Sequence, residues 1–310
     1  MQTRPLGRTG LNVSALSFGG AAVGQQYGPV SHAEVSETIN LAADAGINLI
    51  DTSAFYGMGK SEEILGEVLT PALREKFMIC TKAGRLERAK FDFSAAGMRA
   101  CFEGSLKRLK TDHVDILLAH DIEFADNYEQ VMTETADMLH QLKREGKCRF
   151  IGMSGYPLGL LGQVIERCHL DVIISYCHFH LQDQSLVTDL LPICEKFGVG
   201  VLNASPLAMG LHTLQGPPPW HPAGEEIKDA CRKAAQLCQS RGRNISELGM
   251  QFCLGESRIP STITGTAKRD ELAINLRTLN TLPDPDLLRD VLAILEPVRN
   301  RTWPSGNWKG

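Results

Sequence analysis

The chain of 310 residues is longer than most single domains, but a barrel of eight strand–helix repeats commonly reaches this length. Its net charge of −4 and isoelectric point near 6.2 exclude the strongly basic surface that would indicate nucleic acid or an anionic membrane as a partner. The hydrophobic share of 43% is sufficient for a large buried core.

Targeting and cysteine patterns predict a cytoplasmic protein. No stretch has the length and hydrophobicity of a membrane span, and the amino terminus lacks the basic-then-apolar pattern of a signal peptide. The nine cysteines stand singly along the chain, without Cys-x-x-Cys spacing. We therefore expect reduced thiols that fill the core, and no metal site.

The chain begins with a predicted hairpin. Residues 4–11 contain two glycines at turn positions, and we expect this hairpin to close the bottom of a barrel. Residues 13–19 form the first predicted barrel strand. Ser31 and Glu34 have the spacing of a capping box, which predicts a helix that stops near Gly46.

Eight strand–helix units then follow one another, with no linker rich in glycine and serine between them. The predicted strands cover residues 13–19, 47–51, 77–82, 114–120, 150–154, 171–175, 199–205 and 261–265. The later predicted helices cover residues 61–69, 94–109, 128–144, 158–168, 184–197, 227–241, 246–254 and 287–295. The alternation predicts an α/β fold, namely an (α/β)8 TIM barrel with an N-terminal hairpin and a C-terminal extension, in one domain spanning residues 1–310.

Three predicted strands deliver four polar side chains to one rim of this barrel. Asp51 ends the second strand and Tyr56 follows it. Lys82 ends the third strand and His120 the fourth. The ordinary tyrosine pKa is near ~10, and a buried ammonium beside Tyr56 would lower it, while Asp51 would keep Lys82 charged. With His120 to orient a substrate oxygen, the set predicts proton transfer for a carbonyl/alcohol couple, which requires a hydride carrier.

Each of these side chains alone has a more ordinary interpretation. A lysine at a strand end is commonly a surface ion-pair partner, and a tyrosine is commonly a loop anchor. A histidine at such a position is a core residue with satisfied hydrogen bonds about as often as it is a functional residue. The combination at matching strand ends, and not any single member, indicates catalysis.

Several short motifs resemble the aldo-keto reductase superfamily. They are Gly-Arg-Thr-Gly-Leu-x-Val-Ser at residues 7–14, Asp-Thr-Ser-x-x-Tyr-Gly at 51–57, Thr-Lys at 81–82, His120, and Ser-Pro-Leu at 205–207. Longer strings are similar to the plant-type L-galactose dehydrogenases and their microbial relatives, such as Ala-His-Asp-Ile-Glu-Phe at 119–124 and Thr-Trp-Pro-Ser-Gly at 302–306. The resemblance extends over the whole chain.

The resemblance implies a role for each matching position. Tyr56 would be the general acid/base, tuned by Lys82 and Asp51, and His120 would orient the substrate. The residues expected to bind a nicotinamide cofactor are Gly20, Asp51, Ser154, Gly155, Ser175, Ser205, Pro206, Leu207, Met209, Gly210, Leu211, Gly265, Thr266, Glu271 and Asn275. Within this set, residues 205–211 would run along the pyrophosphate.

Three positions depart from the pattern of the superfamily. Gly155 stands where relatives usually have asparagine, and Ser175 stands where many have glutamine. Ala204 stands where many have an aromatic ring that stacks on the nicotinamide. We therefore expect another group to cover that face of the cofactor.

One carboxylate indicates which cofactor the protein uses. Glu271 stands where relatives that use the phosphorylated cofactor usually carry an arginine. A carboxylate there would repel a 2′-phosphate and could accept a hydrogen bond from a free 2′-hydroxyl. Lys268 and Arg269 favour the opposite choice, although such charges are commonly solvated at the start of a helix. We predict NAD rather than NADP.

Polar groups near the expected site indicate a small-molecule sugar substrate. The expected substrate-binding residues are Tyr56, His120, Asp121, Phe124, His178 and Trp303, with further wall from residues 22–27, Phe55, Glu123 and Phe179. The resemblance implies oxidation of L-galactose, or of a closely related aldose, at C1 to the lactone. The enzymatic alternative is oxidation of a 6-deoxy or pentose sugar such as L-fucose or D-arabinose, or reduction of a non-sugar aldehyde. A non-catalytic cofactor-sensing module on this fold would not need all four catalytic side chains. We expect a monomer or a weak homo-oligomer.

Overall fold

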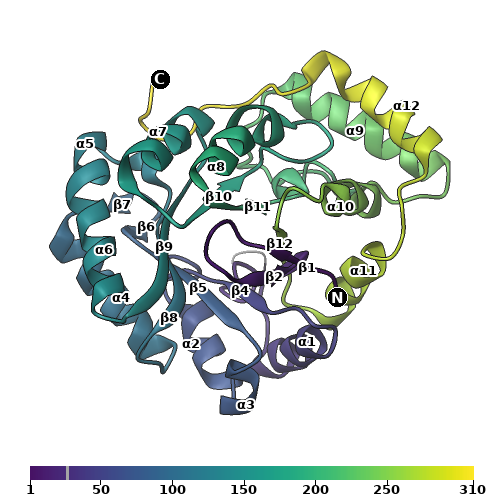
Figure 1. Ribbon diagram of the computed structural model, residues 1–310. Coiled ribbons are helices and arrows are strands. Elements are labelled where there is room, and N and C mark those ends of the chain that lie inside the picture. The colour runs from purple at the N-terminus through teal and green to yellow at the C-terminus, as the bar shows by residue number, and fades with distance from the viewer. Residues whose placement is uncertain (26–27) are drawn as a thin grey trace.

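The centre of the computed structural model, which describes residues 1–25 and 28–310, is a closed barrel of eight parallel strands (Figure 1). The strands are β3 (Leu16–Gly19), β4 (Leu49–Asp51), β5 (Met78–Ala83), β8 (Val114–Ala119), β9 (Cys148–Gly155), β10 (Val172–Tyr176), β11 (Gly200–Ala204) and β12 (Ser261–Gly265). Each pairs with the next in this order, and β12 pairs with β3 to close the barrel. The predicted (α/β)8 TIM barrel is confirmed.

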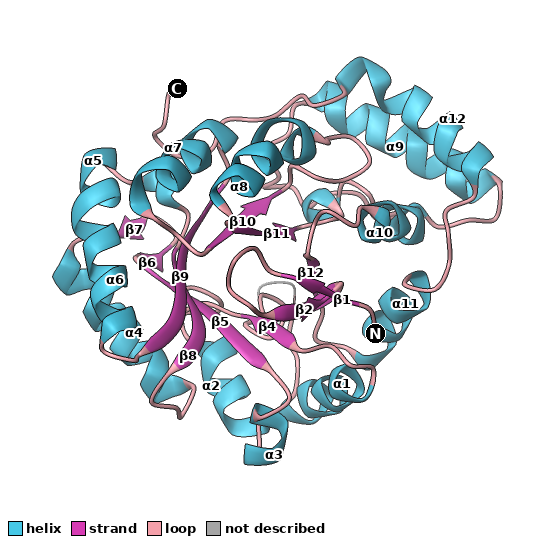
Figure 2. Cartoon of the chain, viewed as in Figure 1, coloured by secondary structure: helices cyan, strands magenta, loops and turns pink. Residues whose placement is uncertain are grey.

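Helices surround the barrel, as Figure 2 shows. They are α1 (His32–Asp44), α2 (Lys60–Val68), α3 (Pro71–Arg74), α4 (Ala95–Arg108), α5 (Tyr128–Gln130), α6 (Ala136–Arg144), α7 (Leu158–Cys168), α8 (Leu191–Phe197), α9 (Glu225–Ser240), α10 (Ile245–Gly255), α11 (Arg269–Thr278) and α12 (Pro285–Leu295). Short 3-10 segments cover Ile122–Phe124, Ala208–Gly210 and Glu296–Val298, and π-helical turns cover Val131–Thr135 and Leu186–Leu190. Among the described residues, the helices all fall short of the length and hydrophobicity needed to cross a membrane.

The predicted capping box is present at the start of α1. The Glu34 backbone N–H donates to the Ser31 hydroxyl at 3.2 Å, and the Ser31 N–H donates to the Glu34 carboxylate at 2.8 Å. Two backbone donors that the first helical turn leaves free are thereby paired. The apolar face of α1 carries Val35 and Ile39, which are completely buried in the layer between helices and barrel.

A short antiparallel hairpin closes the end of the barrel where the strands begin. It consists of β1 (Thr3–Pro5) and β2 (Asn12–Ser14), and Figure 1 shows it across the opening. Its Leu6 and Val13 are fully buried in the barrel interior. The predicted strand 13–19 is therefore split: the Ser14 hydroxyl donates to the Leu16 carbonyl at 2.7 Å, which turns the chain before β3 begins.

Two further segments lie at the opposite rim, where the strands end. β6 (Arg85–Glu87) and β7 (Lys90–Phe91) form a hairpin directly after β5, where the sequence predicted no element. The C-terminal extension begins with α12, which lies beside α9 (Figure 1), and continues as an extended tail. The Asn307 N–H donates to the Glu123 carbonyl at 2.7 Å, which fixes this tail to the loop after β8.

Candidate active site

Three predicted side chains form a hydrogen-bonded chain at the ends of β4 and β5. The Lys82 ammonium nitrogen lies 2.7 and 2.8 Å from the two oxygens of Asp51. It also donates to the Thr52 carbonyl at 2.8 Å and to the Tyr56 hydroxyl at 3.1 Å. β4 and β5 are adjacent strands, with Asp51 paired to Cys80, so Lys82 lies two residues further along its strand on the same side. The barrel thus brings together what the sequence places 31 residues apart.

The electrostatics of this chain keep Lys82 charged and Tyr56 neutral. Burial alone would lower the pKa of Lys82. Asp51 and Tyr56 raise this pKa by more than burial lowers it, so the ammonium keeps its proton. Burial raises the pKa of Tyr56 above its ordinary value and outweighs the attraction of Lys82. The predicted lowering of the tyrosine pKa is therefore wrong as a net effect, because the phenol is completely enclosed and also lies near two carboxylates, Asp51 and Asp121.

His120 lies beside Tyr56, and its two ring nitrogens face different neighbours. The two rings meet edge to face, with centroids 5.7 Å apart. The Ser53 hydroxyl oxygen accepts from the Phe55 N–H at 3.1 Å and lies 2.9 Å from His120 Nδ1. Burial lowers the pKa of His120 to about 3, and the ring is neutral. Nε2 lies 3.5 Å from an Asp121 carboxylate oxygen, an acceptor, so this contact favours the proton on Nε2 and leaves Nδ1 to accept from the Ser53 hydroxyl.

Two cavities meet at this group of side chains. The larger has a volume of about 470 Å³ and extends from Lys82 and His120 to the C-terminal tail. The smaller, of about 330 Å³, extends from Tyr56 to β12 and the start of α11. Both are lined by Ala21, Asp51, Tyr56, Ala204, Ser205 and Met209. A proton donor on this shared wall can act on one molecule in the larger cavity while a second molecule occupies the smaller one.

Comparison with known proteins assigns the family. The model of the Aldo/keto reductase family matches residues 15–295. The chain belongs to this family. The L-galactose dehydrogenase of Arabidopsis thaliana is 44% identical over 99% of this chain and 98% of its own length. The D-arabinose 1-dehydrogenase of Saccharomyces cerevisiae is 30% identical over 86% of this chain and 82% of its own.

A solved structure agrees with the fold. An aldo-keto reductase from Bacillus halodurans, in its holo form, is similar with a TM-score of 0.77 at 24% identity, covering 95% of this chain and 96% of that one. The resemblance that the motifs indicated is confirmed by the family match. The protein is an oxidoreductase of the aldo/keto reductase family.

The larger cavity has most of the predicted substrate-binding side chains in its wall. His178 is not in this wall: its ring packs on Tyr156, with centroids 4.5 Å apart, and its Nδ1 lies 2.9 Å from the Ser185 hydroxyl. Of the expected wall segment 22–27, Ala22 lines the smaller cavity, and residues 26–27 lie outside the described part of the chain. The predicted residues that do line the larger cavity are Phe55, Tyr56, His120, Asp121, Phe124 and Trp303.

The predicted cofactor-binding residues divide between the cavity walls and the layer behind them. Those that line the smaller cavity are Asp51, Ser205, Pro206, Leu207, Met209, Gly210, Gly265 and Glu271, and Ser154 lines the larger one. Gly20, Gly155, Ser175, Leu211, Thr266 and Asn275 line neither. Ser175 follows Ile174, which faces the barrel interior, so its buried side chain points toward the outer layer. Thr266 contacts the wall indirectly, since its hydroxyl donates to the Glu271 carboxylate at 3.0 Å.

The loop after β11 has an unusual backbone where it lines the smaller cavity. Ser205, Ala208 and Met209 have φ of 57°, 47° and 50°, in the left-handed region that non-glycine residues rarely adopt. Gly210 follows at 102°. Such strained residues cluster at ligand sites.

The larger cavity also contains wall residues that sequence reasoning missed. Ser305 belongs to a string that carries the family resemblance, and the predicted role of Trp303 already brought the tail to the site, but no pattern singles out Ser305 or Trp220. Arg85 follows Lys82 by three residues, and this short spacing from a strand end was its one signal. The residues missed are Arg85, Ile174, Tyr176, Trp220, Pro222, Pro304, Ser305 and Gly306.

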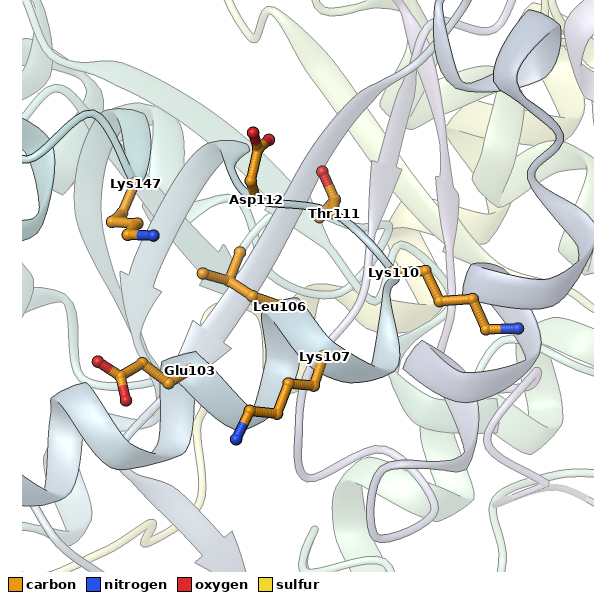
Figure 3. A pocket seen from close by; sticks show the side chains of 7 residues that line it. All are labelled: Glu103, Leu106, Lys107, Lys110, Thr111, Asp112 and Lys147. Carbon is orange, nitrogen blue, oxygen red and sulfur yellow. The ribbon is translucent and has the colours of Figure 1, made fainter.

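Another depression, of about 490 Å³, lies far from this chemistry (Figure 3). Its residues belong to the end of α4, to the turn that leads into β8, and to the start of β9. It is therefore at the face where strands begin, which in such barrels serves stability. Its lysines Lys107, Lys110 and Lys147 stand among the acidic Glu103 and Asp112. Among the residues that the structure describes, no His, Cys, Asp and Glu side chains are grouped to hold a metal ion.

Proposed function

We propose that the protein is an NAD-dependent dehydrogenase that oxidises L-galactose, or a closely related aldose, at C1 to the aldonolactone. The observation that carries the proposal is the position of Tyr56, hydrogen-bonded to Lys82 and next to His120, on the wall shared by two cavities. The 44% identity with the L-galactose dehydrogenase of Arabidopsis thaliana over nearly the whole chain supports this substrate.

The protein's own side chains would move one proton and orient one oxygen. His120 donates its Nε2 proton to the reacting oxygen and holds it beside the Tyr56 hydroxyl. In oxidation the Tyr56 oxygen takes the proton of the C1 hydroxyl, and Lys82 stabilises the negative charge that the phenol carries when it is deprotonated. In reduction the neutral phenol gives this proton back.

The smaller cavity fits a nicotinamide dinucleotide. Small residues form much of its wall, among them Gly19, Ala21, Ala22 and Gly265, and they allow a ligand to approach the backbone. A Cβ added to Gly265 would have one heavy atom within 4 Å, the Gly19 carbonyl oxygen at 3.9 Å, so there is open space on that side. When bound, the nicotinamide supplies or accepts the hydride.

Glu271 supports NAD as the cofactor. Its carboxylate lines the smaller cavity and is oriented by the Thr266 hydroxyl at 3.0 Å. A carboxylate in this wall opposes a 2′-phosphate and accepts from a 2′-hydroxyl. Lys268 and Arg269 are exposed at the start of α11, and neither lines the cavity. Glu271→Gln should therefore increase the use of NADP relative to NAD.

Initial rates of L-galactose oxidation test the proposal. They are measured with NAD and with NADP, on the parent and on Tyr56→Phe. We expect rapid reduction of NAD by the parent and a loss of about 10²–10⁴-fold in the variant, because phenylalanine keeps the ring and removes the acid/base. A faster reaction with NADP would contradict the cofactor assignment. A parent that binds NADH but leaves L-galactose unchanged would contradict the substrate.

A second aldose is the alternative that a specific observation favours. The D-arabinose 1-dehydrogenase of Saccharomyces cerevisiae is 30% identical over 86% of this chain. Rates measured on L-galactose, L-fucose and D-arabinose at equal concentration separate the candidates. A kcat/KM for D-arabinose above that for L-galactose would favour the alternative.

A further inference from the structure

Arg85 is a cation in the wall of the larger cavity. It takes no part in the proton chain, by which we mean the hydrogen-bonded Asp51, Lys82 and Tyr56. It is the first residue of β6, and Gly84 turns the chain after β5 with φ of 97°. A Cβ at Gly84 would lie 2.8 Å from the Phe93 ring, so this turn requires glycine. The turn directs Arg85 back over the rim, where its side chain is 16% exposed.

Three aromatic rings and one carboxylate hold the guanidinium group of Arg85. Its central carbon lies 3.8 Å from the centroid of the Phe55 ring, and 5.4 and 5.5 Å from those of Phe91 and Phe124. Phe91 and Phe124 stack on each other at 4.9 Å. Nη1 pairs with the Asp121 carboxylate. A guanidinium held on several sides is pre-organised and loses little freedom when it binds a ligand.

Much of the hydrogen-bonding capacity of this pair is free for a ligand. An arginine has five N–H donors. In the described part of the chain, Arg85 donates to Asp121 through Nη1, its Nε is enclosed by protein, and the N–H groups of Nη2 have no protein partner. The same Asp121 carboxylate lies 3.5 Å from Nε2 of His120. The pair therefore offers donors and an acceptor next to the histidine that orients the reacting oxygen.

The charge of the wall favours an uncharged ligand rich in hydroxyls. Arg85 is neutralised by Asp121, and Lys82 by Asp51, so the wall has no net charge to attract a phosphate or a carboxylate. A hydroxyl both donates and accepts, and two neighbouring hydroxyls match a guanidinium beside a carboxylate. The rings of Phe124, Trp220 and Trp303 give the cavity an apolar side for the C–H face of such a molecule.

We propose that Arg85 and Asp121 bind the hydroxyls on the carbons next to the reacting carbon, and that this pair selects 2,3-dihydroxylated aldehydes and aldoses. The position follows from the contact of Asp121 with His120: a ligand whose reacting oxygen bonds to His120 places its next oxygens toward Asp121 and Arg85. The inference deepens the proposed function and rests on it for the identity of the sugar.

The test compares substrates that differ in these hydroxyls alone. Reduction of glyceraldehyde and of propanal with NADH is measured on the parent and on Arg85→Met, Arg85→Lys and Asp121→Asn. Arg88→Met, an exposed position in the same hairpin, is the matched control. Because a hydrogen bond to a charged group is lost, we expect kcat/KM for glyceraldehyde to fall about ten- to a hundredfold in Arg85→Met and Asp121→Asn. Propanal should change less than about threefold in Arg85→Met, and Arg88→Met should match the parent.

Arg85→Lys keeps the charge opposite Asp121 and removes the planar fork, so its loss should also be confined to glyceraldehyde. NADH binding, followed by fluorescence, reports whether each variant is folded. Equal losses on glyceraldehyde and propanal in folded variants would overturn the inference, because the pair would then act on the proton chain or the fold. If the parent leaves L-galactose unchanged but the glyceraldehyde-specific loss appears, the sugar assignment fails and the inference stands.

Discussion

Ser53→Ala removes one hydroxyl between the backbone and His120. Ser53 is fully buried; its oxygen accepts from the Phe55 N–H at 3.1 Å and lies 2.9 Å from His120 Nδ1. The substitution leaves one donor and one acceptor without partners. Two neutral hydrogen bonds contribute about 1–3 kcal/mol together, and we expect the free energy of unfolding to fall by about that amount.

The catalytic effect should follow from the tautomer of the histidine. With the ring proton on Nε2, facing the substrate oxygen, Nδ1 accepts from the Ser53 hydroxyl, and this hydrogen bond favours that tautomer. A bias of about 1 kcal/mol toward this tautomer would be lost, which corresponds to about fivefold in the tautomer ratio. We therefore expect kcat/KM to fall by up to about fivefold, with NADH binding unchanged.

Nitrogen-15 NMR of the His120 ring, together with initial rates, checks this prediction. Ser17→Ala is the matched control, because it removes a buried hydroxyl that is hydrogen-bonded to Ser261 at 2.6 Å, away from the site. We expect the control to lose stability and keep its rate. If Ser53→Ala keeps both the parent's ring-nitrogen shifts and its rate, then Ser53 does not set the tautomer and the reasoning is refuted.

Three further predictions concern stability and the tail. Lys82→Met leaves Asp51 buried without its partner, so urea unfolding should show a loss of about 3–5 kcal/mol; a loss below 1 kcal/mol would contradict the ion pair. Burial raises the pKa of Glu123 to about 8, so the native carboxyl keeps a proton that the unfolded chain releases above its ordinary value of 4.5. This contribution to stability is complete below pH 4.5 and is lost as the pH rises through 8. Glu123→Gln, which cannot ionise, should therefore gain stability relative to the parent between these pH values, whereas a constant difference would contradict the raised pKa. Gly306 has φ of 67° and packs on the Glu123 carbonyl, so Gly306→Ala should displace the tail and raise KM for the sugar without changing the Kd of NADH.

Much of the fold could be predicted because its signal is repeated. Each strand of the barrel is a short apolar run followed by polar residues, and eight such runs alternate with helical patterns. Asp51, Lys82 and His120 could be brought together for the same reason, since parallel strands end at one rim. That residues 1–310 form a single domain stays a prediction.

The remaining features depend on contacts that no short-range pattern records. The hairpin from Arg85 to Phe91 is too short to show a period, and the stacking of Phe91 on Phe124 that holds it joins distant segments. The pKa of Tyr56 depends on how completely the phenol is enclosed, so reasoning from Lys82 alone predicted the wrong direction. The location of His178 outside the cavity wall depends on the direction of one side chain, which packs on Tyr156.

The origin of the wall residues has a consequence for redesign. The proton chain depends on Asp51 and Lys82, which belong to strands of the barrel, whereas Arg85, Trp220 and Trp303 come from three separate rim segments. None of these segments contributes to the hydrogen-bonded barrel. A library that exchanges the β6–β7 hairpin, the segment 214–222 or the tail could therefore change which hydroxylated compound is accepted, while the acid/base machinery is inherited intact.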